Sequence, residues 1–555
     1  MKRVWIVVGL LLVLVAGLSA LVGVLLRERL GGGVEVTGPA VVEIDLEGPL
    51  VEKFAADPFI AGVEPARYQL LDLVRAIRAA ARDERVRGVV LRVGAPGYGW
   101  AKAEEIREQL AAFRRTGKFV YAYLPPTDEL GYYVALAADR IYLLPDGGLE
   151  LNGFRAETPF VLQTFRKLGL EAQVESVGAY KSAADILRRE NMSDEDREVT
   201  EGILRERYDR FVDAVVEGRH VDRSAFRAAL DRGVYLAADL RALGLVDGEL
   251  YESQVRELAV RRALDPAEPP EHAEGRVAGT SDASPDTAAE DEHDTGAAYD
   301  DHVVHFLDYL TVLPDARRGG GTVALVYAVG AITSGYDGMD PVFGRTLGSA
   351  STAEMLREVA ADERVNAVVL RVDSPGGDAW ASEEIWAEVE ELREVVPVVA
   401  SMSDVAGSGG YYIAAGADEI VAAPSTVTGS IGVLGVVFNA AETWRKLGVT
   451  WDTVATNEGA AFPTTTRALT EAERVTFRAL IEDLYRGFVE RVAAGRGMTV
   501  ERVDAVAQGR VWSGTQALER GLEDRVGGLQ AAIDAAKKLA ELDPDAPVSL
   551  VVYPR

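Results

Sequence analysis

The chain contains one arrangement of motifs twice, at a constant offset of 279 residues. In the first half, DERVRGVVLRVGAPGY (83–98) precedes TDELGYYVALAADRIY (127–142). In the second half, DERVNAVVLRVDSPGG (362–377) precedes AGSGGYYIAAGADEIV (406–421). Self-similarity at a fixed spacing indicates that a whole structural unit was duplicated. The chain is therefore expected to fold as two related units, each with its own core.

The two copies differ at the positions that could carry chemistry. Ser408 of the second copy corresponds to Glu129 of the first. Lys181 lies in GAYKSAADIL of the first copy, and its counterpart, after a small gap, falls near Phe462. One copy has kept a serine and the other a lysine. The sequence therefore predicts one active site to which both repeats contribute.

Both copies alternate short apolar segments with segments of helical periodicity, which is typical of parallel βαβ units. We therefore expect an α/β fold, duplicated in tandem. The apolar, β-branched segments predicted as strands are 41–47, 89–93, 119–124 and 141–144, repeated as 323–328, 368–372, 396–402 and 420–423. The predicted helices are 70–82, 101–114 and one from about 131, repeated as 352–361, 381–394 and one from about 408. Each copy ends in a helix-rich section, 194–264 and 470–541.

Two segments of unusual composition delimit the repeats. Residues 4–26 form an uncharged apolar run of 23 residues, long enough to cross a bilayer as a helix. Residues 265–301 are acidic and almost without large apolar side chains, so we expect disorder there. The predicted domains are an anchor and tether at 1–33, a lysine-bearing repeat at 34–264, the acidic linker, and a serine-bearing repeat at 302–555.

The apolar run bears on location. We expect an uncleaved anchor with its N-terminus in the cytoplasm and the bulk of the chain outside, in an inner membrane that it crosses once. A cleaved signal peptide is the alternative, and it would export the same part of the chain.

Composition excludes several classes of function. The net charge is −29, with 88 acidic and 59 basic residues, which argues against nucleic acid as a partner. The chain has no cysteine, so disulfides, zinc–thiolate sites and a cysteine nucleophile are excluded. Four of its five histidines fall in or beside the acidic linker, which argues against a Ser-His-Asp triad or a histidine metal site. A nucleophilic serine would need another base.

Lysine can be that base where burial holds it neutral, and Lys181 lies among small and apolar residues. Ser408 falls at a glycine-rich turn before a helix, where the N–H groups of Gly409 and of the Gly376-Gly377 loop could bind an oxyanion. Taken singly, Ser408 also fits a helix N-cap, and Lys181 a solvated surface residue.

The first copy is expected to have no serine site of its own. Its loop has Tyr98 where the second copy has Gly377, and a bulky side chain there would fill the space that a substrate needs.

Four motifs in this order, GAYKSA, DSPGG, AGSGGYY and TGSIGV (428–433), resemble the signal peptide peptidase A (protease IV) family of serine–lysine peptidases in its long tandem form. The resemblance implies a Clp/crotonase-type fold in each repeat and a bowl-shaped homotetramer. It implies Ser408 as nucleophile, Lys181 as general base and Ser430 as a residue that orients the lysine. Asp378 stands where relatives more often have a small residue, which bears on subsite preference.

The predicted function is that of a membrane-anchored serine endopeptidase that needs no cofactor and cleaves apolar peptides, chiefly signal-peptide remnants. Two alternatives keep the fold. One is a crotonase-like enzyme acting on acyl thioesters, which would use the oxyanion N–H groups without a serine nucleophile. The other is a membrane scaffold without catalytic activity.

Overall fold

The computed structural model describes residues 36, 38–54, 68–234, 236–266, 299, 301–313, 320–342 and 344–554. The predicted anchor at 4–26 and nearly all of the acidic segment at 265–301 lie outside these ranges. Within them, no helix is both long and apolar enough to cross a membrane.

The first repeat is built on a six-stranded parallel sheet in the order β11-β8-β6-β4-β1-β12. Its strands are rich in Val, Ile, Leu and Tyr, as expected of parallel strands with both faces covered. They are β1 (Ala40–Asp45), β4 (Val86–Arg92), β6 (Phe119–Leu124), β8 (Arg140–Leu143), β11 (Gly248–Glu249) and β12 (Val303–His305). The main connecting helices are α3 (Leu70–Arg82), α4 (Trp100–Arg115) and α5 (Glu129–Ala135).

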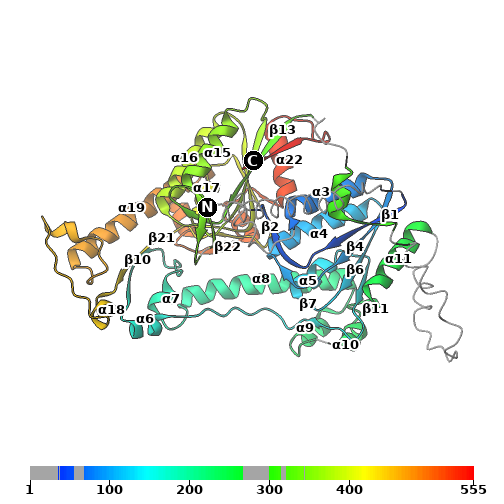
Figure 1. Ribbon diagram of the computed structural model, residues 1–555, viewed down its shortest axis with the longest axis horizontal. Helices are drawn as coiled ribbons and strands as arrows, with labels where there is room; N and C mark the ends of the chain where they lie inside the picture. Colours follow the sequence, from blue (N-terminus) through cyan, green and yellow to red (C-terminus); the bar gives the residue numbers. More distant parts are fainter. Residues whose placement is uncertain are drawn as a thin grey trace, which may run out of the picture.

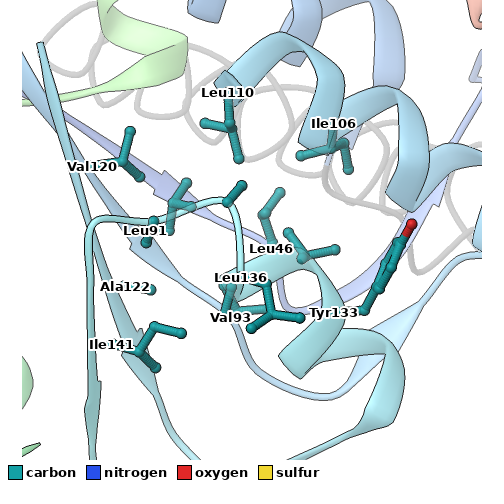
Figure 2. Close-up of a cluster of buried hydrophobic side chains, with 14 of the residues drawn as sticks. Leu46, Leu91, Val93, Ile106, Leu110, Val120, Ala122, Tyr133, Leu136 and Ile141 are labelled. Carbon is teal, nitrogen blue, oxygen red and sulfur yellow. The ribbon is translucent and has the colours of Figure 1, made fainter. Parts of the chain in front are cut away.

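The core of the first repeat lies between this sheet and its helices. Figure 2 shows Leu91, Val120 and Ile141 of the sheet facing Ile106 and Leu110 of α4. All five are fully buried. Each such side chain stabilises the fold by about 1.5–3 kcal/mol relative to an exposed one.

The second repeat has the same strand order, β23-β19-β18-β17-β13-β24, and β20 and β22 extend β18 on one side. Its strands are β13 (Thr322–Val329), β17 (Ala367–Ser374), β18 (Val398–Gly407), β19 (Glu419–Ala422), β20 (Val427–Gly429), β22 (Val511–Ser513), β23 (Arg525–Val526) and β24 (Ser549–Tyr553). Its main helices are α15 (Ser349–Ala360), α16 (Ala379–Arg393), α17 (Gly409–Ala414) and α22 (Leu529–Leu539). The expected tandem α/β fold is confirmed.

The predicted boundary at residue 302 needs correction. β12 pairs in parallel with β1, so it belongs to the first sheet, just as β24 pairs with β13 in the second. The following helix, α14 (Phe306–Thr311), buries Phe306 and Tyr309 in the first core. The acidic segment therefore joins α11 (Glu252–Leu264) to the last strand of the first repeat, and it is not a linker between the repeats.

The helix-rich ends of both repeats are as expected, with α8 (Asp194–Arg219), α9 (Arg223–Leu230) and α10 (Ala237–Ala242) in the first and α19 (Glu471–Arg496), α20 (Val500–Val506) and α21 (Gly514–Glu519) in the second. An antiparallel ribbon joins the repeats, because β10 (Glu171–Val177) of the first pairs with β21 (Val433–Asn439) of the second. Figure 1 shows this ribbon beside α18 (Ala441–Lys446) and α6 (Leu162–Leu168) at one end of the molecule, with α8 running along its lower side.

Buried charges also join the repeats. Arg371 of β17 is fully buried, and its guanidinium donates to both Glu52 and Glu105 of the first repeat at 2.7–2.9 Å. A buried guanidinium is tolerated only where its donors are paired in this way. The second sheet therefore reaches its native environment only against the first repeat.

Candidate active site

Ser408 lies at the sharp turn between β18 and α17. Its backbone has φ 53° and ψ −117°, in a region that non-glycine residues rarely adopt. Its N–H donates to the Gly429 carbonyl at 2.9 Å, which holds the turn against β20. Such strain, of order 1–3 kcal/mol, persists where the surrounding structure fixes a side chain in position. The Ser408 hydroxyl is thus presented at the end of the second sheet.

Lys181 of the first repeat meets Ser408 of the second. Its Nζ lies 3.0 Å from Ser408 Oγ, and it donates to Ser430 Oγ and to the Ser430 carbonyl, also at 3.0 Å. The lysine side chain is buried, with 7% of the residue exposed. Burial lowers the pKa of Lys181 from 10.5 to about 8, because the charged ammonium is desolvated.

The backbone of the second repeat fits closely around Lys181. The N–H of Tyr180 donates to the Gln508 carbonyl at 2.8 Å. A Cβ at Gly509 would lie 2.6 Å from the Lys181 backbone and Cβ, and Gly509 also has a φ of +75°. Only glycine fits there. The sequence contains no motif that marks Gln508 or Gly509, so both were missed.

The loop from Asp373 to Gly377 lies against the serine. A Cβ at Gly376 would lie 2.7 Å from Ser408 Cβ, so the close approach requires glycine. The N–H of Gly376 donates to Ser374 Oγ at 3.2 Å. Within the described part of the chain, the N–H groups of Gly377 and Gly409 have no recorded protein partner. Of the two loop glycines, Gly377 is therefore the one with a donor free for a ligand.

The corresponding region of the first repeat is arranged differently. Glu129, at the position of Ser408, is buried, and its Oε1 accepts the N–H groups of Asn152 and Gly153 at 2.6 and 2.8 Å. Burial raises the pKa of Glu129. The Tyr98 hydroxyl is also buried, at the position of Gly377. The expectation of open space at Gly377 needs correction, because a Cβ there would lie 2.0 Å from the Ile332 carbonyl oxygen, so the glycine packs against the backbone of the neighbouring strand.

Asp378, which was expected to bear on subsite preference, lies at the start of α16: its carboxylate caps the helix by accepting the Ala381 N–H at 2.8 Å. Within the described ranges, no group of three or more His, Asp or Glu side chains is arranged to hold a metal ion.

Sequence reasoning gave no role to three charged residues near the site, although Asp373 begins the DSPGG motif. Lys102 of α4 donates to Asp373 Oδ2 at 2.7 Å and to Asp404 Oδ2 at 2.6 Å. The rarity of lysine, with only nine in the chain, was the one available signal. Its partners on β17 and β18 could not be read from the sequence.

Both repeats of the chain match a known family. The pattern of peptidase family S49 matches residues 112–265 and 390–543, together more than half of the chain. Serine protease SPPA, chloroplastic, of Arabidopsis thaliana is 33% identical over 481 residues, covering 86% of this chain and 66% of that protein. Protease 4 of Salmonella typhi is 32% identical over 540 residues, covering 94% and 82%.

Among solved structures, a ClpP1 mutant from Listeria monocytogenes is 11% identical with a TM-score of 0.25, covering 38% of this chain and 94% of that chain. The assignment rests on the sequence matches, which extend over both repeats. The chain therefore belongs to peptidase family S49, and with the relatives named Protease 4 and SPPA it is a serine endopeptidase.

Proposed function

We propose that Ser408 and Lys181 form a serine–lysine dyad that cleaves peptide bonds through an acyl-enzyme. The observation that carries the proposal is the 3.0 Å approach of Lys181 Nζ to Ser408 Oγ in a buried setting. A neutral amine has two N–H groups and one lone pair. Ser430 accepts both N–H groups through its hydroxyl and carbonyl oxygens, which leaves the lone pair for the Ser408 proton.

The reaction then follows from this geometry. Lys181 takes the Ser408 proton as Oγ attacks the carbonyl carbon of the substrate. The N–H groups of Gly377 and Gly409 bind the oxyanion, each contributing about 3–4 kcal/mol. Lys181 returns the proton to the leaving amine, which departs as the new N-terminus. Water then attacks the acyl-enzyme by the same steps and releases the carboxylic acid.

The proposed substrates are apolar peptides, chiefly signal-peptide remnants, cleaved on the outer side of an inner membrane that the chain crosses once. The apolar run at 4–26 and the resemblance of the motifs support this location. The five-residue DSPGG loop presents little bulk beside Ser408, which leaves room for an extended peptide.

A second copy of the chain is the proposed structural partner, with four copies in the assembly. Two segments support this assembly, because each is the counterpart of a ribbon strand in the other repeat but forms no strand itself. The counterpart of β21, 279 residues earlier, is 154–160, and the counterpart of β10, 279 residues later, is 450–456. Both segments are described, neither is assigned to a strand, and nearly all of their residues are exposed. Segment 450–456 of one copy can pair with 154–160 of the next as β10 pairs with β21, in a head-to-tail ring.

Hydrolysis of a fluorogenic apolar peptide by the full-length chain in detergent tests the catalytic proposal. We expect wild type to turn over and both Ser408→Ala and Lys181→Met to lose at least about a thousandfold in kcat. Lys118→Met, which removes a half-buried lysine bonded to the Ala80 and Asp83 carbonyls, is the matched control and should keep its activity. Turnover that survives Lys181→Met would contradict the dyad. An inactive wild type would favour the scaffold or thioester alternatives.

A further inference from the structure

Lys102 lies where the two strands that lead to the catalytic groups lose their regular pairing. β17 and β18 pair in parallel from Val368 to Val372, and the register then shifts before Ser374 pairs with Ala406. Asp373 and Asp404 lie in this irregular stretch. Because the ladder of backbone hydrogen bonds between β17 and β18 is interrupted there, side chains can contribute to fixing the relative position of the two strand ends.

Lys102 is the side chain that joins them. Its Nζ donates to Asp373 Oδ2 at 2.7 Å and to Asp404 Oδ2 at 2.6 Å, with Glu52 Oε1 at 3.6 Å. Asp373 also accepts the Val405 N–H at 3.2 Å. Only 4% of Lys102 is exposed. Charge-assisted bonds of this length, removed from water, are the strong ones.

The two aspartates stand at matched distances from the reacting groups. Asp373 precedes Gly377 by four residues along the chain, and Asp404 precedes Ser408 by four. Asp404 is in addition fixed to the start of α4, since it accepts the N–H groups of Gly99 and Lys102 at 3.0 and 3.2 Å. A shift at either aspartate is therefore transmitted to an oxyanion donor or to the nucleophile through a short, ordered segment.

The first repeat provides an internal comparison. At the fixed offset, Asp373 corresponds to Gly94, Asp404 to Pro125 and Lys102 to Ala381. The two aspartates are thus absent from the strand ends of the first repeat, where Glu129 replaces the nucleophile, and no lysine stands at the counterpart of Lys102. A contact that only joined the repeats would not be expected to depend on whether a serine nucleophile is present.

We propose that Lys102 is a positioning residue, which sets the distance between Ser408 and the Gly377 N–H by joining Asp373 to Asp404. This inference rests on the proposed function. It assigns to the first repeat a second contribution besides Lys181. Lys181 exchanges the proton, and Lys102 holds the serine and the oxyanion loop together as a permanent cation.

The test compares Lys102→Met, Lys102→Arg and wild type in the full-length chain with the fluorogenic peptide. We expect Lys102→Met to lower kcat about tenfold to a hundredfold while KM stays within about twofold, since a displaced oxyanion donor acts in the transition state. Lys102→Arg, which keeps the charge, should recover part of the loss. The midpoint of the pH profile should not move, because Lys102 is not the base.

Lys537→Met is the matched control. Lys537 is also buried, at 6% exposed, and donates to the Pro544 and Ala546 carbonyls. It should lower thermal stability without lowering kcat. Wild-type kcat in Lys102→Met, or an equal loss of kcat in both variants, would overturn the proposal.

Two further measurements cover other outcomes. If Lys102→Met does not fold, the triple variant Lys102→Met, Asp373→Asn, Asp404→Asn removes the buried charges together and keeps one acceptor oxygen at each asparagine. It should fold and show the same loss of kcat, whereas wild-type kcat in it would overturn the proposal.

Hydrogen exchange of the peptide spanning 373–380 needs no turnover. It should be at least about tenfold faster in the Lys102 variant than in Lys537→Met. Equal exchange would overturn the positioning role even if wild type proved inactive as a peptidase.

Discussion

Two buried lysines of the first repeat reach into the second, and their surroundings give them opposite charge states. Lys181 contacts hydroxyl and carbonyl oxygens, and burial lowers its pKa to about 8. Burial acts in the same direction on Lys102, but Asp373, Asp404 and Glu52 outweigh it and raise the pKa of Lys102 above its ordinary value. A lysine without a carboxylate partner can serve as a base, and one among three carboxylates cannot.

The lowered pKa of Lys181 implies a cost in stability with a defined pH dependence. Because its pKa is about 8 when folded and near 10.5 when unfolded, the unfolded chain binds more protons between these values. The stability of wild type therefore rises with pH across this window, and below it the full cost, about 3 kcal/mol, applies.

We expect Lys181→Met to raise the thermal midpoint near pH 7 and to lose this advantage by about pH 10.5. Calorimetry at several pH values measures the difference, with the exposed Lys446→Met as control. A variant that is less stable than wild type at pH 7 would show that the lysine is not desolvated as described.

At the scale of elements, α4 shows how one helix serves both repeats. Its apolar positions face its own sheet, as Figure 2 shows for Ile106 and Leu110. Lys102, Glu105 and Gln109, spaced three and four residues apart, are buried on another side. Lys102 and Glu105 contact the second repeat. A helix with one apolar and one charged buried stripe must lie between two bodies.

The equivalent helices α5 and α17 differ at their starts, where the first has Glu129 and the second has Ser408. Glu129→Ala should destabilise the chain by about 1–3 kcal/mol, because the Asn152 and Gly153 N–H groups lose a buried acceptor. Glu129→Gln, which keeps an acceptor oxygen, should cost less. Urea unfolding measures the free energy of unfolding of both variants. Equal losses in Glu129→Ala and Glu129→Gln would show that the acceptor oxygen at this position does not stabilise the fold.

Glu129→Ser in a Ser408→Ala background should remain inactive in peptide hydrolysis. Tyr98 stands in place of Gly377, and Lys181 lies at the other site. Recovered activity would show that the first repeat kept a competent site.

The elements that could be predicted are those fixed by local periodicity. The helix expected at 70–82 and the strand expected at 119–124 were found with these bounds as α3 and β6. β12 was missed because three residues after an acidic segment carry no periodic signal, and its place depends on pairing with β1. Ser408 and Lys181 came from comparing the repeats, and Ser430 from the resemblance of its motif to a known family. The contacts of Lys102 depend on how two sheets pack, which no local pattern encodes.

At the scale of the whole molecule, the repeats form one unit joined by buried charge. Arg371 is bound by Glu52 and Glu105 across the contact. Arg371→Met should destabilise the chain by about 3–5 kcal/mol, because two buried carboxylates lose their cation. The triple variant with Glu52→Gln and Glu105→Gln should recover much of this loss. Urea unfolding measures both, and a single variant as stable as wild type would contradict this role of the ion cluster.

The segments 154–160 and 450–456, which are the counterparts of β21 and β10, are proposed to pair between copies of the chain. Thr453→Pro and Val454→Pro, within 450–456, should shift the chain to smaller species in light scattering after gel filtration, because proline cannot donate to a strand ladder. A proline at the exposed Val475 would break helix α19, so it is not a suitable control. Val449→Ala, just outside the segment, is the control instead. An unchanged mass in the proline variants would contradict the proposed pairing.

The most direct test of a site divided between repeats is the pH dependence of acylation of Ser408 by a reactive peptide ester, measured before steady state. We expect the wild-type rate to rise with pH through one ionisation near pH 8, the value to which burial lowers the pKa of Lys181. Lys181→Met and Lys181→Arg should both lose this rise, since neither side chain can accept the proton. If the same ionisation persists in the Lys181 variants, the base lies elsewhere and the account of a divided dyad is wrong.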